Sequence, residues 1–151
     1  MSDVRELYQE MILDHCRSPR NRRVPEGANC CATGNNPLCG DQLDVHLRMA
    51  GDRIAEIGFQ GHGCAISTAS ASLMTESVRG KSRGEVEALF HRLHDLVTGK
   101  ADPATAAAEL GKLVVFGGVS EFPLRVKCAT LAWHTLRAAL EGEEDSVVST
   151  E

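Results

Sequence analysis

The sequence predicts an α+β fold, in which a small antiparallel sheet of about three strands carries helices on one face. The first observation is a β-hairpin pattern: residues 43–49 alternate between apolar and polar side chains, and residues 54–59 alternate again after a Gly51-Asp52 turn. The second is the spacing of apolar residues by three and four on both sides of this hairpin, which is typical of amphipathic helices. The chain has 151 residues and no internal repeat, so we expect one domain over residues 1–140.

The N-terminal part is predicted to contain one helix, a loop and a weak strand. Residues 3–16 carry apolar side chains at helical spacing, and Asp3 with Glu6 forms a plausible capping box. Pro19 ends this helix, because the residue before a proline disfavours helical backbone. A short strand is expected over residues 28–34, before the hairpin.

Two helices are predicted directly after the hairpin. Small residues fill the stretch 65–78, which ends before Gly80 and is typical of a closely packed helix. The clearest amphipathic pattern in the chain covers residues 85–98 and stops at Gly99.

The C-terminal part is predicted to be helical up to an acidic tail. Asp102-Pro103 begins a short Ala-rich helix, since proline suits the first helical position. Gly117-Gly118 and Pro123 then mark a loop, and a last helix is expected over residues 129–140. The tail, residues 141–151, is acidic and is expected to be disordered.

Composition and charge exclude several classes of protein. A formal net charge of −5 argues against a general nucleic-acid binder, which would be basic. No secretory signal or membrane-spanning stretch is visible, so we expect a cytoplasmic protein without a membrane partner. One basic segment stands out, the loop at residues 17–23, which is either solvated or a docking site for an acidic partner surface. Its four arginines are Arg17, Arg20, Arg22 and Arg23.

Six cysteines in a cytosolic chain indicate metal binding or reactive thiols rather than disulfides. Cys39 and Asp41 flank one glycine on a turn just before a strand, so both side chains can reach the same ion. Cys64 and Cys128 each precede a run that the pattern predicts to be helical, where free amides favour an ionised thiol. These four side chains could hold one Zn²⁺ ion. Their spacing matches no compact zinc-finger rule, and buried cysteines also occur as small apolar residues.

Three motifs follow one another in the chain: Asn36-Pro37-x-Cys39-Gly40-Asp41, Gly61-x-Gly63-Cys64 and Lys127-Cys128. They are accompanied near the N-terminus by Leu7-Tyr8, Asp14-His15 and Pro19-Arg20-Asn21. Together they resemble the NifU N-terminal / IscU-like family of iron–sulfur cluster assembly proteins, over about residues 4–140. The resemblance implies a SufE/NifU-like α+β fold.

Departures from the IscU pattern make the chain similar to the SufU branch of this family. Lys127 stands where IscU-type scaffolds carry a histidine, and residues 99–122 contain extra sequence of the SufU kind. Residues 122–126 replace the chaperone-recognition segment of IscU-type proteins, so no dedicated Hsp70-type chaperone is expected.

The resemblance implies zinc bound by Cys39, Asp41, Cys64 and Cys128. It also implies that sulfane sulfur arrives from a PLP-dependent cysteine desulfurase of the SufS type and passes on to downstream Suf scaffold proteins. Cys39 is the predicted acceptor and catalytic residue, because its turn is flanked by glycine whereas the other two thiols are held by helices. Cys39 would leave the metal to attack the persulfide, and a partner histidine could replace it.

Other residues near these motifs have two possible roles. Arg125 and Lys127 could offset the negative charge of the site, and His62 could assist proton transfer, although each could equally be a solvated neighbour. Cys16 and the Cys30-Cys31 pair match no motif position; Cys16 is expected to pack, and adjacent strand residues point to opposite faces.

Two further functions remain open at this point. The same four residues could assemble a labile [2Fe–2S] cluster, since thiolates suit iron as well as zinc. Alternatively, the chain could be a structural zinc module whose arginine-rich loop binds nucleic acid, a function that the acidic net charge disfavours.

Overall fold

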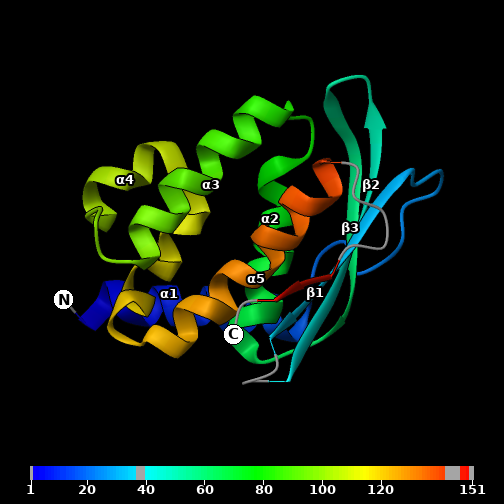
Figure 1. Ribbon diagram of the computed structural model, residues 1–151. Coiled ribbons are helices and arrows are strands. Elements are labelled where there is room, and N and C mark those ends of the chain that lie inside the picture. The colour runs from blue at the N-terminus through cyan, green and yellow to red at the C-terminus, as the bar shows by residue number, and fades with distance from the viewer. Residues whose placement is uncertain (1, 37–39, 142–146, 150–151) are drawn as a thin grey trace.

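The computed structural model describes residues 2–36, 40–141 and 147–149, with side chains described for 6–36 and 40–141. A sheet lies on one side of the molecule and all helices cover the same face of it, which confirms the predicted α+β class (Figure 1). The strands follow the order β3-β2-β1-β4. Their bounds are β1 Cys30–Asn36, β2 Asp41–Ala50, β3 Arg53–His62 and β4 Val147–Ser149.

The predicted hairpin is the centre of the sheet. Strands β2 and β3 pair antiparallel around the Gly51-Asp52 turn, and β1 pairs antiparallel with the other edge of β2. The alternation read from the sequence matches the burial, since Leu43, Val45 and Leu47 are buried while the residues between them are half-buried. The prediction for β1 was two residues too early at each end, because its inward positions include Gly34 and Asn36, which carry no apolar signal.

The helices form two layers against this sheet. Helices α2 (Ala65–Val78) and α5 (Pro123–Leu140) lie directly on it, and α1 (Ser2–Arg17), α3 (Arg83–Val97) and α4 (Pro103–Leu110) lie outside them (Figure 1). Buried small residues let α2 pack on several sides at once. The largest fully buried side chains come from the strands, the helices and the segment before α5: Trp133, Phe59, Phe116, Leu43, Leu47, Ile54 and Ile57.

Close contact between α5 and β1 depends on one glycine. A Cβ on Gly34 would lie 1.9 Å from the Thr135 Oγ1 of α5, so a larger residue would push the helix off the strand. This approach brings the N-terminal half of α5 to the end of β1, beside the first residue of β2.

Three sequence-based predictions for the C-terminal half were wrong. The region expected as a loop is a 3₁₀ helix, η1 (Gly111–Glu121), whose apolar residues Leu113 to Phe116 are buried. Helix α5 begins at Pro123 rather than after Cys128. In the tail expected to be disordered, Val147–Ser149 forms β4, which pairs parallel with β1 and adds a fourth strand.

Candidate metal centre

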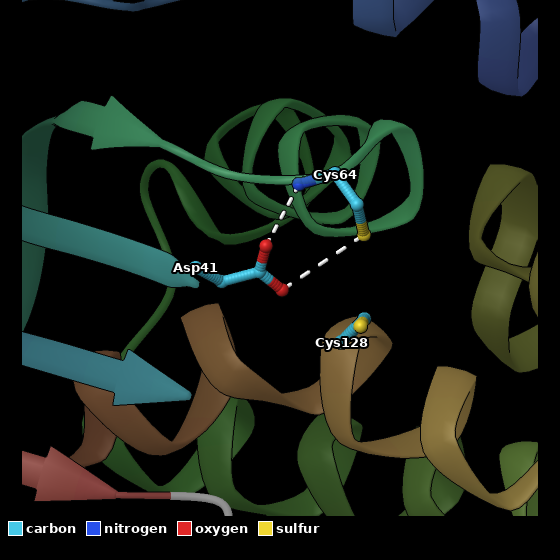
Figure 2. Close-up of side chains that lie close together, drawn as sticks. All are labelled: Asp41, Cys64 and Cys128. Carbon is cyan, nitrogen blue, oxygen red and sulfur yellow. Dashed lines mark hydrogen bonds between the residues drawn. The ribbon is translucent and has the colours of Figure 1, made fainter. Parts of the chain in front are cut away.

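Three of the candidate ligands meet where β2 begins and β3 ends, each from a different part of the chain. Asp41 is the first residue of β2, Cys64 stands between β3 and α2, and Cys128 lies in α5 (Figure 2). Their ligand atoms all lie within 4.8 Å of one another. Ligand atoms in a tetrahedral zinc site are about 3.5–3.8 Å apart, so small side-chain shifts would let these three share one ion. Cys39, the fourth candidate, lies outside the described residues.

Asp41 has no exposed surface and its carboxylate is held in a fixed orientation. Its Oδ1 accepts a hydrogen bond from the backbone N–H of Cys64 at 2.8 Å. Its Oδ2 lies 3.8 Å from the Cys64 Sγ and faces the two thiols (Figure 2). A buried carboxylate needs a positive partner or several donors, and a metal cation is one group that would meet this need.

Cys64 occupies the N-cap of α2, as the sequence predicted. Its Sγ accepts a hydrogen bond from the backbone N–H of Ser67 at 3.4 Å, which is the position where a helix end favours negative charge. Gly61 places this turn: its φ is 118°, and a Cβ there would lie 2.1 Å from the Gln42 carbonyl oxygen. Only glycine tolerates both conditions, so the chain can pass close to β2 before it reaches Cys64.

Cys128 does not lie at a helix N-terminus, contrary to the prediction. Helix α5 begins five residues earlier, with Pro123 at its first position, so Cys128 falls in the second turn. The free amides and the dipole effect of a helix end are confined to the first turn, so they do not act on this thiol. Cys128 is nevertheless fully buried, and its Sγ lies within 4.8 Å of the ligand atoms of Asp41 and Cys64.

Arg125 supplies positive charge beside the thiols. The neighbouring Cys64 thiol raises the pKa of the Arg125 guanidinium above its usual value, and Cys128 adds to the effect; hydrogen bonding to both sulfurs contributes as well. Arg125 precedes Cys128 by three residues, the spacing that places two side chains on one face of a helix. A cation in this place could offset the charge of a metal-binding set of two ionised cysteines and a carboxylate.

The other two supporting candidates are less closely tied to the ligands. Lys127 is half-buried beside Cys128, and within the described part of the chain no ion pair joins its ammonium group to the site. His62 is the last residue of β3 and is exposed.

The arginine-rich loop is used largely within the molecule. Arg20 forms an ion pair with Asp14 at 2.6 Å, and Arg23 lies 3.7 Å from Glu56. Arg22 donates a hydrogen bond to the Gly61 carbonyl oxygen at 2.7 Å, so this loop supports the turn that carries Cys64. Arg17 is exposed and remains available to a partner.

The remaining thiols do not join the cluster. Cys16, Cys30 and Cys31 are half-buried, and Asp41, Cys64 and Cys128 form the sole group of this kind among the residues whose positions are described. Cys30 packs against the core while Cys31 lies on the other face of β1, as expected for adjacent strand residues.

Sequence reasoning missed Ser67, a fully buried serine one helical turn after Cys64. Its hydroxyl has no hydrogen-bond partner in the described structure. The only signal in the sequence is its position three residues after a cysteine at a helix start, which alone would not single it out.

The donor set fits a borderline metal ion. Two thiolates and one carboxylate, completed by a fourth ligand, would suit Zn²⁺ and could also hold iron in a cluster. The donor set does not suit Mg²⁺ or Ca²⁺, which prefer oxygen ligands throughout.

Comparisons with known proteins agree with these features. The family described as NifU-like N terminal domain matches residues 7–129. A relative from Streptococcus pyogenes serotype M1, named iron-sulfur cluster assembly scaffold protein IscU, is 39% identical over 141 residues, which cover 93% of this chain and 87% of the relative. The zinc-dependent sulfurtransferase SufU of Bacillus subtilis (strain 168) is 37% identical over 138 residues, which cover 91% of this chain and 92% of SufU.

A solved structure has the same fold. The crystal structure of a SUF-system iron–sulfur cluster assembly scaffold protein from Fervidobacterium islandicum AW-1 matches with a TM-score of 0.80 and 35% identity. The match covers 87% of this chain and 94% of that one.

Proposed function

The chain belongs to the NifU-like N-terminal domain family of iron–sulfur cluster assembly proteins, and within it we propose that it is a zinc-dependent sulfur-transfer protein. In this role it accepts persulfide sulfur from a PLP-dependent cysteine desulfurase of the SufS type. The observation that carries the proposal is the approach of Asp41, Cys64 and Cys128 to within 4.8 Å. The name of the Bacillus subtilis relative, a zinc-dependent sulfurtransferase, supports zinc over iron.

Zinc would be held by Asp41, Cys64, Cys128 and Cys39, which follows Asn36-Pro37 in the motif. When bound, Zn²⁺ supplies a fixed positive charge that keeps its thiol ligands ionised at neutral pH. The Cys64 N–H orients the carboxylate of Asp41 through Oδ1, so Oδ2 would be the oxygen available to hold the ion.

Cys39 is the sulfur acceptor in this proposal. Its thiolate attacks the sulfane sulfur of the desulfurase persulfide, a new S–S bond forms on Cys39, the original S–S bond breaks, and the desulfurase cysteine leaves as a thiolate. Arg125 lies beside the thiols and would offset the negative charge of the ionised thiols. Lys127 and His62 are candidates for the same support, and exposed Arg17 is the arginine best placed for docking.

Metal content and desulfurase turnover test this function. We expect about one zinc per chain in the isolated protein, and faster cysteine turnover by a SufS-type desulfurase when the protein is added. Cys39→Ser should abolish the stimulation, while the matched control Cys31→Ser, outside the cluster, should retain it. After incubation with the desulfurase, mass spectrometry should locate the persulfide on Cys39. Full activity of Cys39→Ser, with sulfur found on Cys64 alone, would reject the assignment.

A second candidate function is assembly of a labile [2Fe–2S] cluster on the same residues. The scaffold name of the Streptococcus pyogenes relative favours it. Colour separates the two: a colourless zinc protein supports sulfur transfer, and a brown protein that bleaches in air supports a scaffold.

The nucleic-acid hypothesis has little support. Arg20, Arg22 and Arg23 are engaged within the molecule, which leaves a small basic surface on an acidic protein. None of the helices described is long and apolar enough to cross a bilayer, and a SufS-type partner would place the protein in the cytoplasm.

A further inference from the structure

Ser67 is a buried serine beside the candidate metal centre, and no described residue pairs with its hydroxyl. The residue has no exposed surface, and its Oγ forms no hydrogen bond with the part of the chain that the structure describes. Its backbone N–H donates to the Cys64 Sγ at 3.4 Å, so the residue already contacts one candidate ligand. A buried hydroxyl without a partner is unfavourable and uncommon, so a state that provides a partner is expected.

Gly63 shows where this hydroxyl lies relative to Asp41. A Cβ on Gly63 would lie 3.0 Å from the Asp41 Oδ1 and 3.0 Å from the Ser67 Oγ. The two oxygens therefore border the same small space, no more than twice that distance apart, and the absence of a side chain at Gly63 leaves the space open. Rotation about the Cα–Cβ bond of Ser67 moves its Oγ within it.

We propose that Ser67 is a positioning residue of the metal centre, whose hydroxyl donates a hydrogen bond to the Asp41 Oδ1 while Oδ2 binds the ion. This inference rests on the proposed function. A carboxylate oxygen has two lone pairs, so Oδ1 can accept from both the Cys64 N–H and the Ser67 hydroxyl. Two donors on one oxygen fix the rotation of the carboxylate and leave Oδ2 free for the metal. Groups that orient a ligand in this way strengthen metal binding without touching the ion.

The variant Ser67→Ala tests the proposal through zinc affinity, measured by competition with a chromophoric chelator. We expect zinc to bind about 10–100-fold more weakly, the usual cost of losing a group that orients a metal ligand. The hydroxyl has no partner among the described residues, so without zinc Ser67→Ala should unfold at the same temperature as the unaltered protein or at a higher one. A role in packing or folding alone would instead lower that temperature and leave the affinity unchanged.

Ser77→Ala is the matched control, because it removes a hydroxyl from the same helix. Ser77 Oγ donates to the Leu73 carbonyl oxygen at 2.8 Å within the helix, away from the candidate ligands, so this variant should leave zinc affinity unchanged. Gly63→Ala is a second variant at the site: its Cβ would enter the space between the two oxygens and should weaken zinc binding by itself.

The outcomes separate this inference from the proposed function. Unchanged zinc affinity in Ser67→Ala would overturn the role of Ser67 and leave the metal centre intact. An equal loss of affinity in Ser77→Ala would overturn it too, because the effect would then be general to the helix. Failure of the unaltered protein to bind zinc would overturn the zinc-dependent function and this inference with it.

Discussion

Replacing Asp41 by Asn and by Ala should separate its two contributions, one to folding and one to metal binding. Asn keeps an oxygen that can accept the Cys64 N–H, now 2.8 Å from Oδ1, and it removes a buried charge. Metal-free Asp41→Asn should therefore be as stable as the unaltered protein or more stable. Ala leaves that amide buried without an acceptor, which costs about 1–3 kcal/mol. For a chain of 151 residues, this loss lowers the midpoint of thermal unfolding by about 2–12 °C.

With zinc present, both variants should be less stable than the unaltered protein. A ligand present at 1,000 times its dissociation constant stabilises the folded state by about 4 kcal/mol, or roughly 8–16 °C here. Both variants should lose most of this gain, because neither an amide nor a methyl group replaces the Oδ2 ligand. Scanning calorimetry of metal-free and zinc-loaded samples measures both quantities. If Asp41→Asn retains the whole zinc-induced shift, Asp41 is not a ligand. Equal metal-free stability of the two variants would refute the argument about the Cys64 amide.

Gly61→Ala should lower the free energy of unfolding by about 2–5 kcal/mol, because Gly61 has a positive φ and a Cβ there would clash with the backbone of β2. Gly51 also has a positive φ but open space around it, so Gly51→Ala should cost only about 1–2 kcal/mol. Denaturant titration measures both values. Burial lowers the pKa of His15, so the unfolded state binds its proton more readily, and stability should fall as the pH drops below about 6.5. Denaturant midpoints from pH 8 to 5 should show a smaller fall for His15→Asn, and an identical fall would contradict this. Arg125→Ala should slow persulfide acceptance about tenfold, because the site would attract the negatively charged persulfide less strongly. The control Arg92→Ala, on α3, should not change the rate. Equal rates for the two variants would refute the role of Arg125.

Elements with a regular burial period could be predicted from the sequence. The hairpin was located because β2 has one face in the core, and α3 because its buried residues recur every three to four positions. Helix α5 was placed too late for the same reason: its first five residues are exposed or half-buried, so apolar spacing begins only at Cys128. Pro123 marked the true start of the helix and was interpreted as the end of a loop.

Elements that depend on distant partners could not be predicted. Strand β4 pairs with the free edge of β1, and nothing in the acidic tail itself indicates a strand. In η1, four apolar residues follow one another from Leu113 to Phe116. This run shows neither the spacing of three to four residues typical of a helix nor the alternation typical of a strand. Similarly, the sequence suggested a positive charge at Arg125, but it gave no indication of Ser67, because the burial of its hydroxyl without a partner among the described residues exists only in the folded chain.

The meeting of the candidate ligands is a property of close backbone approaches more than of the cysteine motifs. Gly34 lets α5 lie against β1, and Gly61 lets the chain before Cys64 pass against β2. A Cβ at either position would lie about 2 Å from another atom, so the backbone there would have to move. Metal ligands must be placed to within about 0.5 Å, so even a small movement of this backbone would disturb the site. Glycines that are not themselves candidate ligands therefore help to decide whether Asp41, Cys64 and Cys128 share an ion. A search for cysteines alone would find the same residue types in a protein whose backbone keeps them apart.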